Sequence, residues 1–133
     1  MAMRGCGTPV RGSGKDQTIW KLEWTFGASG AVTIDSTQSD EDPDIATPLT
    51  DEDTGIVAVA FPKCSRFWVL GKNFTPVDPT TGTEYRIHEV TDKSAAAGTC
   101  KVRFFDVLGD ATPAAQDPVS GARYQLLLLL ERP

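Results

Sequence analysis

The stretch ARYQLLLLLE, residues 122–131, decides the fold of this chain. At a period of two residues, one face of this stretch carries four large apolar side chains, Tyr124, Leu126, Leu128 and Leu130. The other face is polar at both ends and carries Leu127 and Leu129 in its middle. A strand that is apolar on both faces is typical of the centre of a sheet. The alternative, a buried leucine-rich helix, would be short and would follow turn residues instead of a helical pattern.

Six further segments have the alternation or the β-branched and aromatic content of strands: residues 17–26, 31–35, 56–61, 66–73, 84–91 and 100–107. Turn-rich loops separate them, and no stretch has a convincing period of 3.6 residues. We therefore expect an all-β fold, a single-domain antiparallel β-sandwich or jelly-roll-like barrel with an extended N-terminal arm.

Apolar and polar residues alternate more regularly in the segment QTIWKLEWTF, residues 17–26, than in the other five segments. We expect one apolar stripe in the core, made by Trp20, Leu22, Trp24 and Phe26 together with Leu126 and Leu128. These two runs supply the largest apolar faces in the chain. The alternative is an aromatic binding platform on the surface.

Residues 1–16 are rich in glycine and basic side chains and carry little that could be buried. Such a segment cannot offset the entropy lost on ordering, so we expect a flexible or extended arm unless a partner holds it. Residues 17–133 then form the sandwich domain. Three basic side chains of the arm, Arg4, Arg11 and Lys15, are candidate contacts to an acidic partner surface.

An acidic segment, residues 35–54, interrupts the strand pattern. Eight acidic residues and no basic residue lie between positions 35 and 53. The spacing of a calcium-binding EF-hand loop is missing, so a solvated loop or a contact surface is expected, and cation binding stays open.

Length and composition exclude several classes of protein. The 133 residues suit one domain, and the net charge of −5 argues against a nucleic-acid partner. No leader or membrane anchor is expected, since the start lacks an apolar run and five leucines are far fewer than the about 20 apolar residues of a transmembrane helix. Three widely spaced cysteines, Cys6, Cys64 and Cys100, favour synthesis in a reducing cytoplasm, with a Cys64–Cys100 pair left open.

Catalytic motifs are missing from the sequence. His88 is the one histidine, so any histidine-dependent hydrolase would have to use it. No phosphate-binding glycine motif or zinc spacing occurs. We therefore expect no enzyme, and no catalytic, cofactor-binding or metal-ligating residues; a small hydrolase that uses His88 is the alternative.

The C-terminal two thirds resembles small structural proteins of tailed bacteriophages. The likeness rests on GIVAVAFP (residues 55–62), AAAGTCKVRFF (residues 95–105), PAAQDPVSGAR (residues 113–123) and YQLLLLLE (residues 124–131). Such proteins are similar to capsid cement or decoration proteins, which often sit as trimers on the outside of the icosahedral head. The resemblance implies a place on the virion after synthesis in the host cytoplasm, and the major capsid protein as partner. It transfers no site residues.

The resulting hypothesis is that this chain is a capsid cement protein, which binds the outer surface of the head and stabilises contacts between capsomers. Leu127 and Leu129 are the candidate contacts between copies, since the second face of their strand needs a cover. Two alternatives remain: a phage tail or connector protein, and a carbohydrate-binding β-sandwich that uses Trp20, Trp24 or Trp68.

Overall fold

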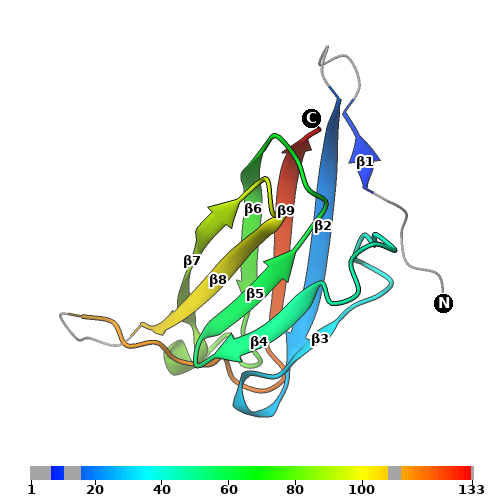
Figure 1. The fold of residues 1–133 in the computed structure, drawn as a ribbon. Coiled ribbons are helices and arrows are strands. Elements are labelled where there is room, and N and C mark those ends of the chain that lie inside the picture. Colours follow the sequence, from blue (N-terminus) through cyan, green and yellow to red (C-terminus); the bar gives the residue numbers. More distant parts are fainter. Residues whose placement is uncertain (1–6, 11–15, 108–111, 133) are drawn as a thin grey trace.

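The computed structural model describes residues 7–10, 16–107 and 112–132. Two antiparallel sheets pack face to face as a β-sandwich (Figure 1). One sheet, which we call the β9 sheet, has the order β1-β2-β9-β6 with β3 beside β2; its strands are β1 (Thr8–Pro9), β2 (Gln17–Phe26), β3 (Val32–Ile34), β6 (Arg66–Thr75) and β9 (Arg123–Glu131). The other, the β8 sheet, has the order β4-β5-β8-β7; its strands are β4 (Leu49–Asp53), β5 (Ile56–Ala60), β7 (Arg86–Ser94) and β8 (Thr99–Asp106). The expected all-β class is confirmed, and the sandwich is the form it takes.

The leucine-rich stretch is the strand β9, as expected, and the helical alternative is wrong. It lies between β2 and β6 and pairs antiparallel with both, so that Leu128 stands between Trp20 and Val69. A bulge in β6 between Val69 and Gly71 interrupts the second ladder. Because β9 has a neighbour on each side, its backbone donors and acceptors are used along most of its length.

The core lies between the two sheets and is built from alternate residues of each strand. All six members of the predicted stripe are buried: Trp20, Leu22, Trp24, Phe26, Leu126 and Leu128. They pack against Val57, Val102 and Phe104 of the β8 sheet in one cluster. Burial of each large side chain contributes about 1.5–3 kcal/mol, so this stripe stabilises the fold strongly.

Aromatic rings join the two sheets at the middle of the core. The ring centroids of Trp24 and Tyr124 are 4.9 Å apart, and those of Phe104 and Tyr124 are 5.2 Å apart in an edge-to-face arrangement. The buried Tyr124 hydroxyl lies 2.8 Å from Nδ1 of His88, which comes from β7 in the opposite sheet. A phenol in the core needs such a polar partner, and this one fixes the position of β7 over β9.

Both described cysteines are free thiols, so the open Cys64–Cys100 pairing is not formed. Burial raises the pKa of Cys100 to about 12 and also raises the pKa of Cys64. A protonated, buried thiol is a poor nucleophile, so these cysteines act as small apolar core residues.

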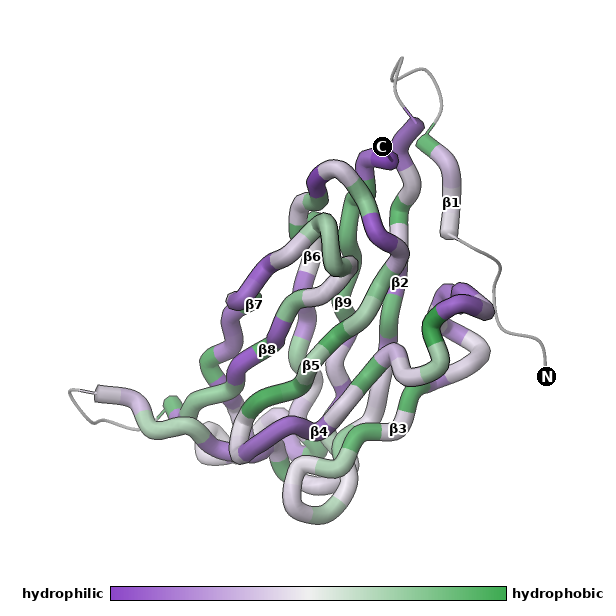
Figure 2. The backbone as a smooth tube through the Cα atoms, viewed as in Figure 1, coloured by the Kyte–Doolittle hydropathy of each residue, from purple (hydrophilic) through white to green (hydrophobic). Residues whose placement is uncertain are grey.

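The acidic segment, residues 35–54, is only partly a loop, and this corrects the expectation. Leu49–Asp53 forms β4 at the edge of the β8 sheet, where it pairs with β5. Figure 2 shows the contrast between the two strands, since β4 is largely hydrophilic and β5 is hydrophobic. Four of the five β4 side chains are exposed, which is why no alternation marks this strand in the sequence.

Part of the N-terminal arm also belongs to a sheet. Thr8 and Pro9 form β1 and pair with Ile19 and Thr18 of β2. The amide of Val10 donates to the carbonyl of Gln17 at 2.9 Å. The partner that holds this part of the arm in an extended conformation is therefore β2 of the same chain.

Candidate functional site

An apolar patch lies on the outer face of the β9 sheet, the face turned away from the core. Strand register places Ile19 of β2, Leu129 of β9 and Trp68 of β6 side by side in one row. Leu127 stands in the next row, between Lys21 and Gly71. Neighbours in such rows have Cβ atoms about 4.5–5.5 Å apart, so these four side chains form one continuous surface. We call Ile19, Trp68, Leu127 and Leu129 the apolar patch.

Trp68 is the most prominent member of the apolar patch. It is 41% exposed, whereas Trp20 and Trp24 are buried in the core. The guanidinium carbon of Arg66 lies 5.2 Å from the centroid of the Trp68 ring, within range of a cation–π contact. The Nε of Arg66 also lies 3.2 Å from a carboxylate oxygen of Glu131. These contacts hold the partly exposed indole against the sheet.

Polar rows border the apolar patch at both ends. The row formed by Gln17, Glu131 and Arg66 lies beyond Trp68, and the row formed by Glu23, Gln125 and Asn73 lies beyond Leu127. An apolar centre inside a polar rim, with tryptophan and arginine, is the usual anatomy of a protein–protein interface.

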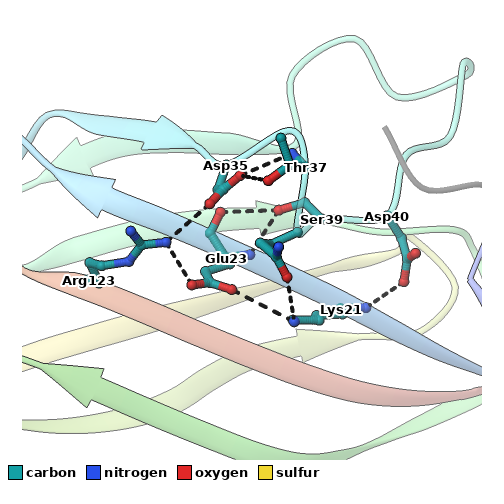
Figure 3. Close-up of polar contacts among 8 residues, drawn as sticks. Lys21, Glu23, Asp35, Thr37, Ser39, Asp40 and Arg123 are labelled. Carbon is teal, nitrogen blue, oxygen red and sulfur yellow. Dashed lines mark hydrogen bonds and ion pairs between the residues drawn. The ribbon is translucent and has the colours of Figure 1, made fainter. Parts of the chain in front are cut away.

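The rim near Glu23 is fixed by a charged network (Figure 3). Arg123 donates hydrogen bonds to Glu23 at 2.8 Å and to Asp35 at 3.1 Å, and these bonds raise the pKa of Arg123. Asp35 accepts further hydrogen bonds from the side chain and backbone of Thr37, which lower its pKa together with Arg123. The end of β3 is therefore tied to β2 and β9 at this border of the face.

The part of the β2 edge that lies between its partners β1 and β3 is closed by the start of the acidic segment (Figure 3). The amide of Lys21 donates to Oδ2 of Asp40 at 2.8 Å, and the amide of Asp40 donates to the carbonyl of Lys21 at 2.8 Å. Ser39 does the same for Glu23, since its hydroxyl accepts from the amide and donates to the carbonyl. Ser39 and Asp40 are buried, so this part is not a solvated loop. Side chains that bond the free backbone amides and carbonyls of a strand edge in this way prevent another chain from adding a strand there.

The outer face of the β8 sheet has a different character. Its middle carries Lys101, which pairs with Glu52 and Asp92, and Arg103, which donates to Asp92 at 3.1 Å. Ile87 is exposed near one end of this face. Exposed charges that are already paired contribute little to binding, at about 0–1 kcal/mol each. The apolar patch is thus the stronger candidate for a contact with a partner.

The structure brings two of the five predicted contact residues into this site. Leu127 and Leu129 lie at the centre of the apolar patch, half-buried by their neighbours. Arg4, Arg11 and Lys15 lie outside the described residues. Ile19 and Trp68 are not predicted by the sequence as members of this surface, although Ile19 breaks the polar face of its strand and Trp68 is a candidate sugar platform.

His88 occupies a structural position between the sheets. Its ring packs near Phe74 and Phe104, and its Nδ1 shares a hydrogen bond with the Tyr124 hydroxyl. Burial, and then the charge of Lys72, lower the pKa of His88 below its usual value of 6.5. These surroundings favour a neutral imidazole that supports Tyr124.

The lowered pKa of His88 predicts a pH dependence of stability. The unfolded chain binds the proton more readily than the folded chain, so the free energy of unfolding should fall as the pH drops below about 6.5. The full stabilisation is present above that pH. In urea titrations at pH 7.5 and 5.5, the wild type should lose more stability than His88→Gln, in which every carboxylate is unchanged. An equal loss in both proteins would show that His88 does not titrate as described.

Within the described residues, no group of three or more histidine, cysteine, aspartate or glutamate side chains is placed to hold a metal ion. The same residues include no helix with the length and apolar character needed to cross a bilayer. No known protein family, no curated protein and no solved structure matches the chain.

Proposed function

We propose that this chain is a virion structural protein of the capsid cement type, which binds the outer surface of the head in many copies and stabilises contacts between capsomers. One observation carries the proposal, the apolar patch with its polar rim on the outer face of the β9 sheet. A surface of this composition suits contact with another protein. The resemblance of residues 55–131 to phage structural proteins supports the choice of partner.

Self-association through the apolar patch fits this role. A cement protein acts at many equivalent positions, so modest contacts between copies and with the shell add up through multivalency. Leu127, Leu129 and Trp68 provide the surface that a second copy would cover. We infer a homotrimer, because the proteins that the chain resembles often form trimers.

Binding to purified heads tests the proposed function. Heads would be prepared from the encoding genome with the gene for this chain deleted, and the purified chain would be added back. We expect saturable co-sedimentation with the heads and a higher temperature of head disruption. The proposal would be overturned if the chain stayed in the supernatant, and binding to tails alone would assign it to the tail or connector instead.

A carbohydrate-binding module is a second candidate, favoured by one observation. Trp68 presents a partly exposed ring on the outer face of the β9 sheet, where a sugar could stack, whereas Trp20 and Trp24 are buried and cannot serve as a sugar platform. This candidate predicts that glycans change the fluorescence of the wild type and leave that of Trp68→Phe unchanged. The cement proposal predicts no response to glycans in either protein.

A further inference from the structure

Gly71 borders the apolar patch, because it pairs with Leu127 across the strands β6 and β9. It is the one glycine within the strands of the described residues. A glycine inside a strand weakens the strand, since it loses more freedom on folding and has no side chain to pack. Such a glycine usually marks a bulge, a tight bend, or a place where another molecule comes close to the backbone.

The bulge in β6 does not require a glycine at this position. The bulge lies between Val69 and Gly71, and the type of bulge that needs glycine holds it in the left-handed region of backbone conformation. The φ angle of Gly71 lies outside that region, unlike that of Gly55 or Gly98. The strand also continues beyond Gly71 to Thr75, still paired with β9, so no tight bend occurs there. An ordinary residue can therefore adopt the backbone conformation of Gly71.

Packing inside the chain does not require a glycine either. Apart from the two adjacent residues, a Cβ atom placed on Gly71 would have one described neighbour within 4 Å, the Cβ atom of Leu127 at 3.8 Å. This is an ordinary van der Waals contact on the outer face of the β9 sheet. The ring of Trp68 contacts Arg66 and does not come within 4 Å of that point. We call the open space over Gly71 and beside Leu127 the Gly71 recess.

The surface around the Gly71 recess is apolar, although its row includes a lysine. Lys21 lies on the far side of Leu127, since β9 separates β2 from β6. The Nζ atom of Lys21 donates to Gln38 at 3.4 Å and lies 3.7 Å from a carboxylate oxygen of Glu23. The ammonium group is therefore held at the β2 side of the face, and a group that enters the recess meets Leu127.

The apolar patch also carries a side chain that suits the Gly71 recess. Trp68 is 41% exposed and stands in the neighbouring row of the same strand, whereas Leu127 and Leu129 are half-buried. A tryptophan that fills a gap in the partner's surface is a common central contact of protein interfaces. A ring of identical copies needs two different surfaces that fit each other, and each copy has one protruding indole and one recess.

We infer that Trp68 of one copy enters the Gly71 recess of a neighbouring copy and packs on Leu127 there. The inference rests on the proposed self-association through the apolar patch and adds the contact that determines which parts of the two patches meet. Gly71 is then a specificity-determining residue, because a side chain at this position would occupy the space that the neighbour's indole needs. The glycine weakens the strand of a single copy and opens the surface to a second copy.

Gly71→Val tests the inference, because it should weaken association without weakening the fold. At a concentration low enough to keep copies apart, its melting temperature should equal that of the wild type or exceed it, since valine favours strands and has room. In sedimentation equilibrium, its dissociation constant should be about tenfold higher or more, because the added side chain overfills the interface. Gly71→Ala should change the dissociation constant in the same direction by a smaller factor.

Gly82→Val is the matched control for Gly71→Val. Gly82 also has an ordinary φ angle and no described atom within 4 Å of an added Cβ atom, but it lies in the short helix η2 (Gly82–Glu84), outside the apolar patch. Its dissociation constant should equal that of the wild type. Equal association of Gly71→Val and wild type, or a lower melting temperature of Gly71→Val, would overturn the inference and leave self-association standing. A wild type that does not associate would overturn both.

A mixture of two variants shows whether the indole and the recess meet across copies. Trp68→Ala keeps the open recess and lacks the indole, whereas Gly71→Val keeps the indole and lacks the open recess. With a donor fluorophore on one variant and an acceptor on the other, energy transfer should appear at concentrations at which neither variant associates with itself. Mixtures of donor and acceptor copies of a single variant provide the baseline. Energy transfer no greater than this baseline would contradict the contact between Trp68 and the Gly71 recess.

Discussion

Replacing Trp24 with alanine is expected to lower the free energy of unfolding by about 3–5 kcal/mol, because it removes a large side chain from the middle of the core. Trp24 is fully buried and contacts Phe26 and Tyr124 at ring distances of 6.2 and 4.9 Å. The substitution leaves a cavity at the centre of the core, where β3 and β9 pair with β2 on either side of Trp24 and limit collapse. Guanidinium chloride titrations followed by circular dichroism measure the change.

Trp68→Ala is the matched control for Trp24→Ala, because it removes the same side chain from the outer face of the same sheet. Substitutions at exposed positions usually change stability by no more than about 0.5 kcal/mol. Both variants should be compared at the same low protein concentration, since association also stabilises the folded state. A loss below about 1 kcal/mol for Trp24→Ala would contradict the description of the core.

Trp68→Ala is expected to weaken self-association about 30-fold or more. Truncation of a central tryptophan in an interface costs about 2 kcal/mol or more, and each 1.4 kcal/mol corresponds to a factor of ten in the dissociation constant. Trp68 is the most exposed member of the apolar patch and stands next to Leu129 across the strand pair. Sedimentation equilibrium over a range of concentrations gives the dissociation constants of wild type and variant.

Ile87→Ala provides the comparison for the association experiment. Ile87 is 48% exposed on the outer face of the β8 sheet, so the substitution removes a similarly accessible apolar side chain from the opposite side of the molecule. The dissociation constant of this variant should equal that of the wild type. A larger effect for Ile87→Ala than for Trp68→Ala would move the interface to the β8 sheet.

The sequence predicts the elements whose two faces differ clearly in polarity. The bounds of Gln17–Phe26 are predicted to the residue, because apolar side chains recur at every second position in the sequence. The burial of all ten positions follows this alternation. The strand β4 is missed, since four of its five side chains are exposed and the sequence TDED has no apolar face. The strand β1 is missed as well, because two residues that include a proline carry no periodic signal.

The candidate site is predicted in part for a similar reason. Leu127 and Leu129 stand out within one strand, since they make its second face apolar. Trp68 and Ile19 join them only through the register of β6 and β2 against β9, which are contacts between residues far apart in the chain. The bonds of Ser39 and Asp40 to the β2 edge depend on the same long-range geometry, so the sequence shows only an acidic segment.

The mass of the wild-type protein in solution tests most directly whether copies of this chain associate. Multi-angle light scattering at micromolar concentration, without capsid, should give three times the 14.3 kDa of one chain. Under the same conditions, Trp68→Ala should shift the mass toward that of one chain. A wild-type mass of a single chain at these concentrations would contradict the assignment of the apolar patch as a contact between copies.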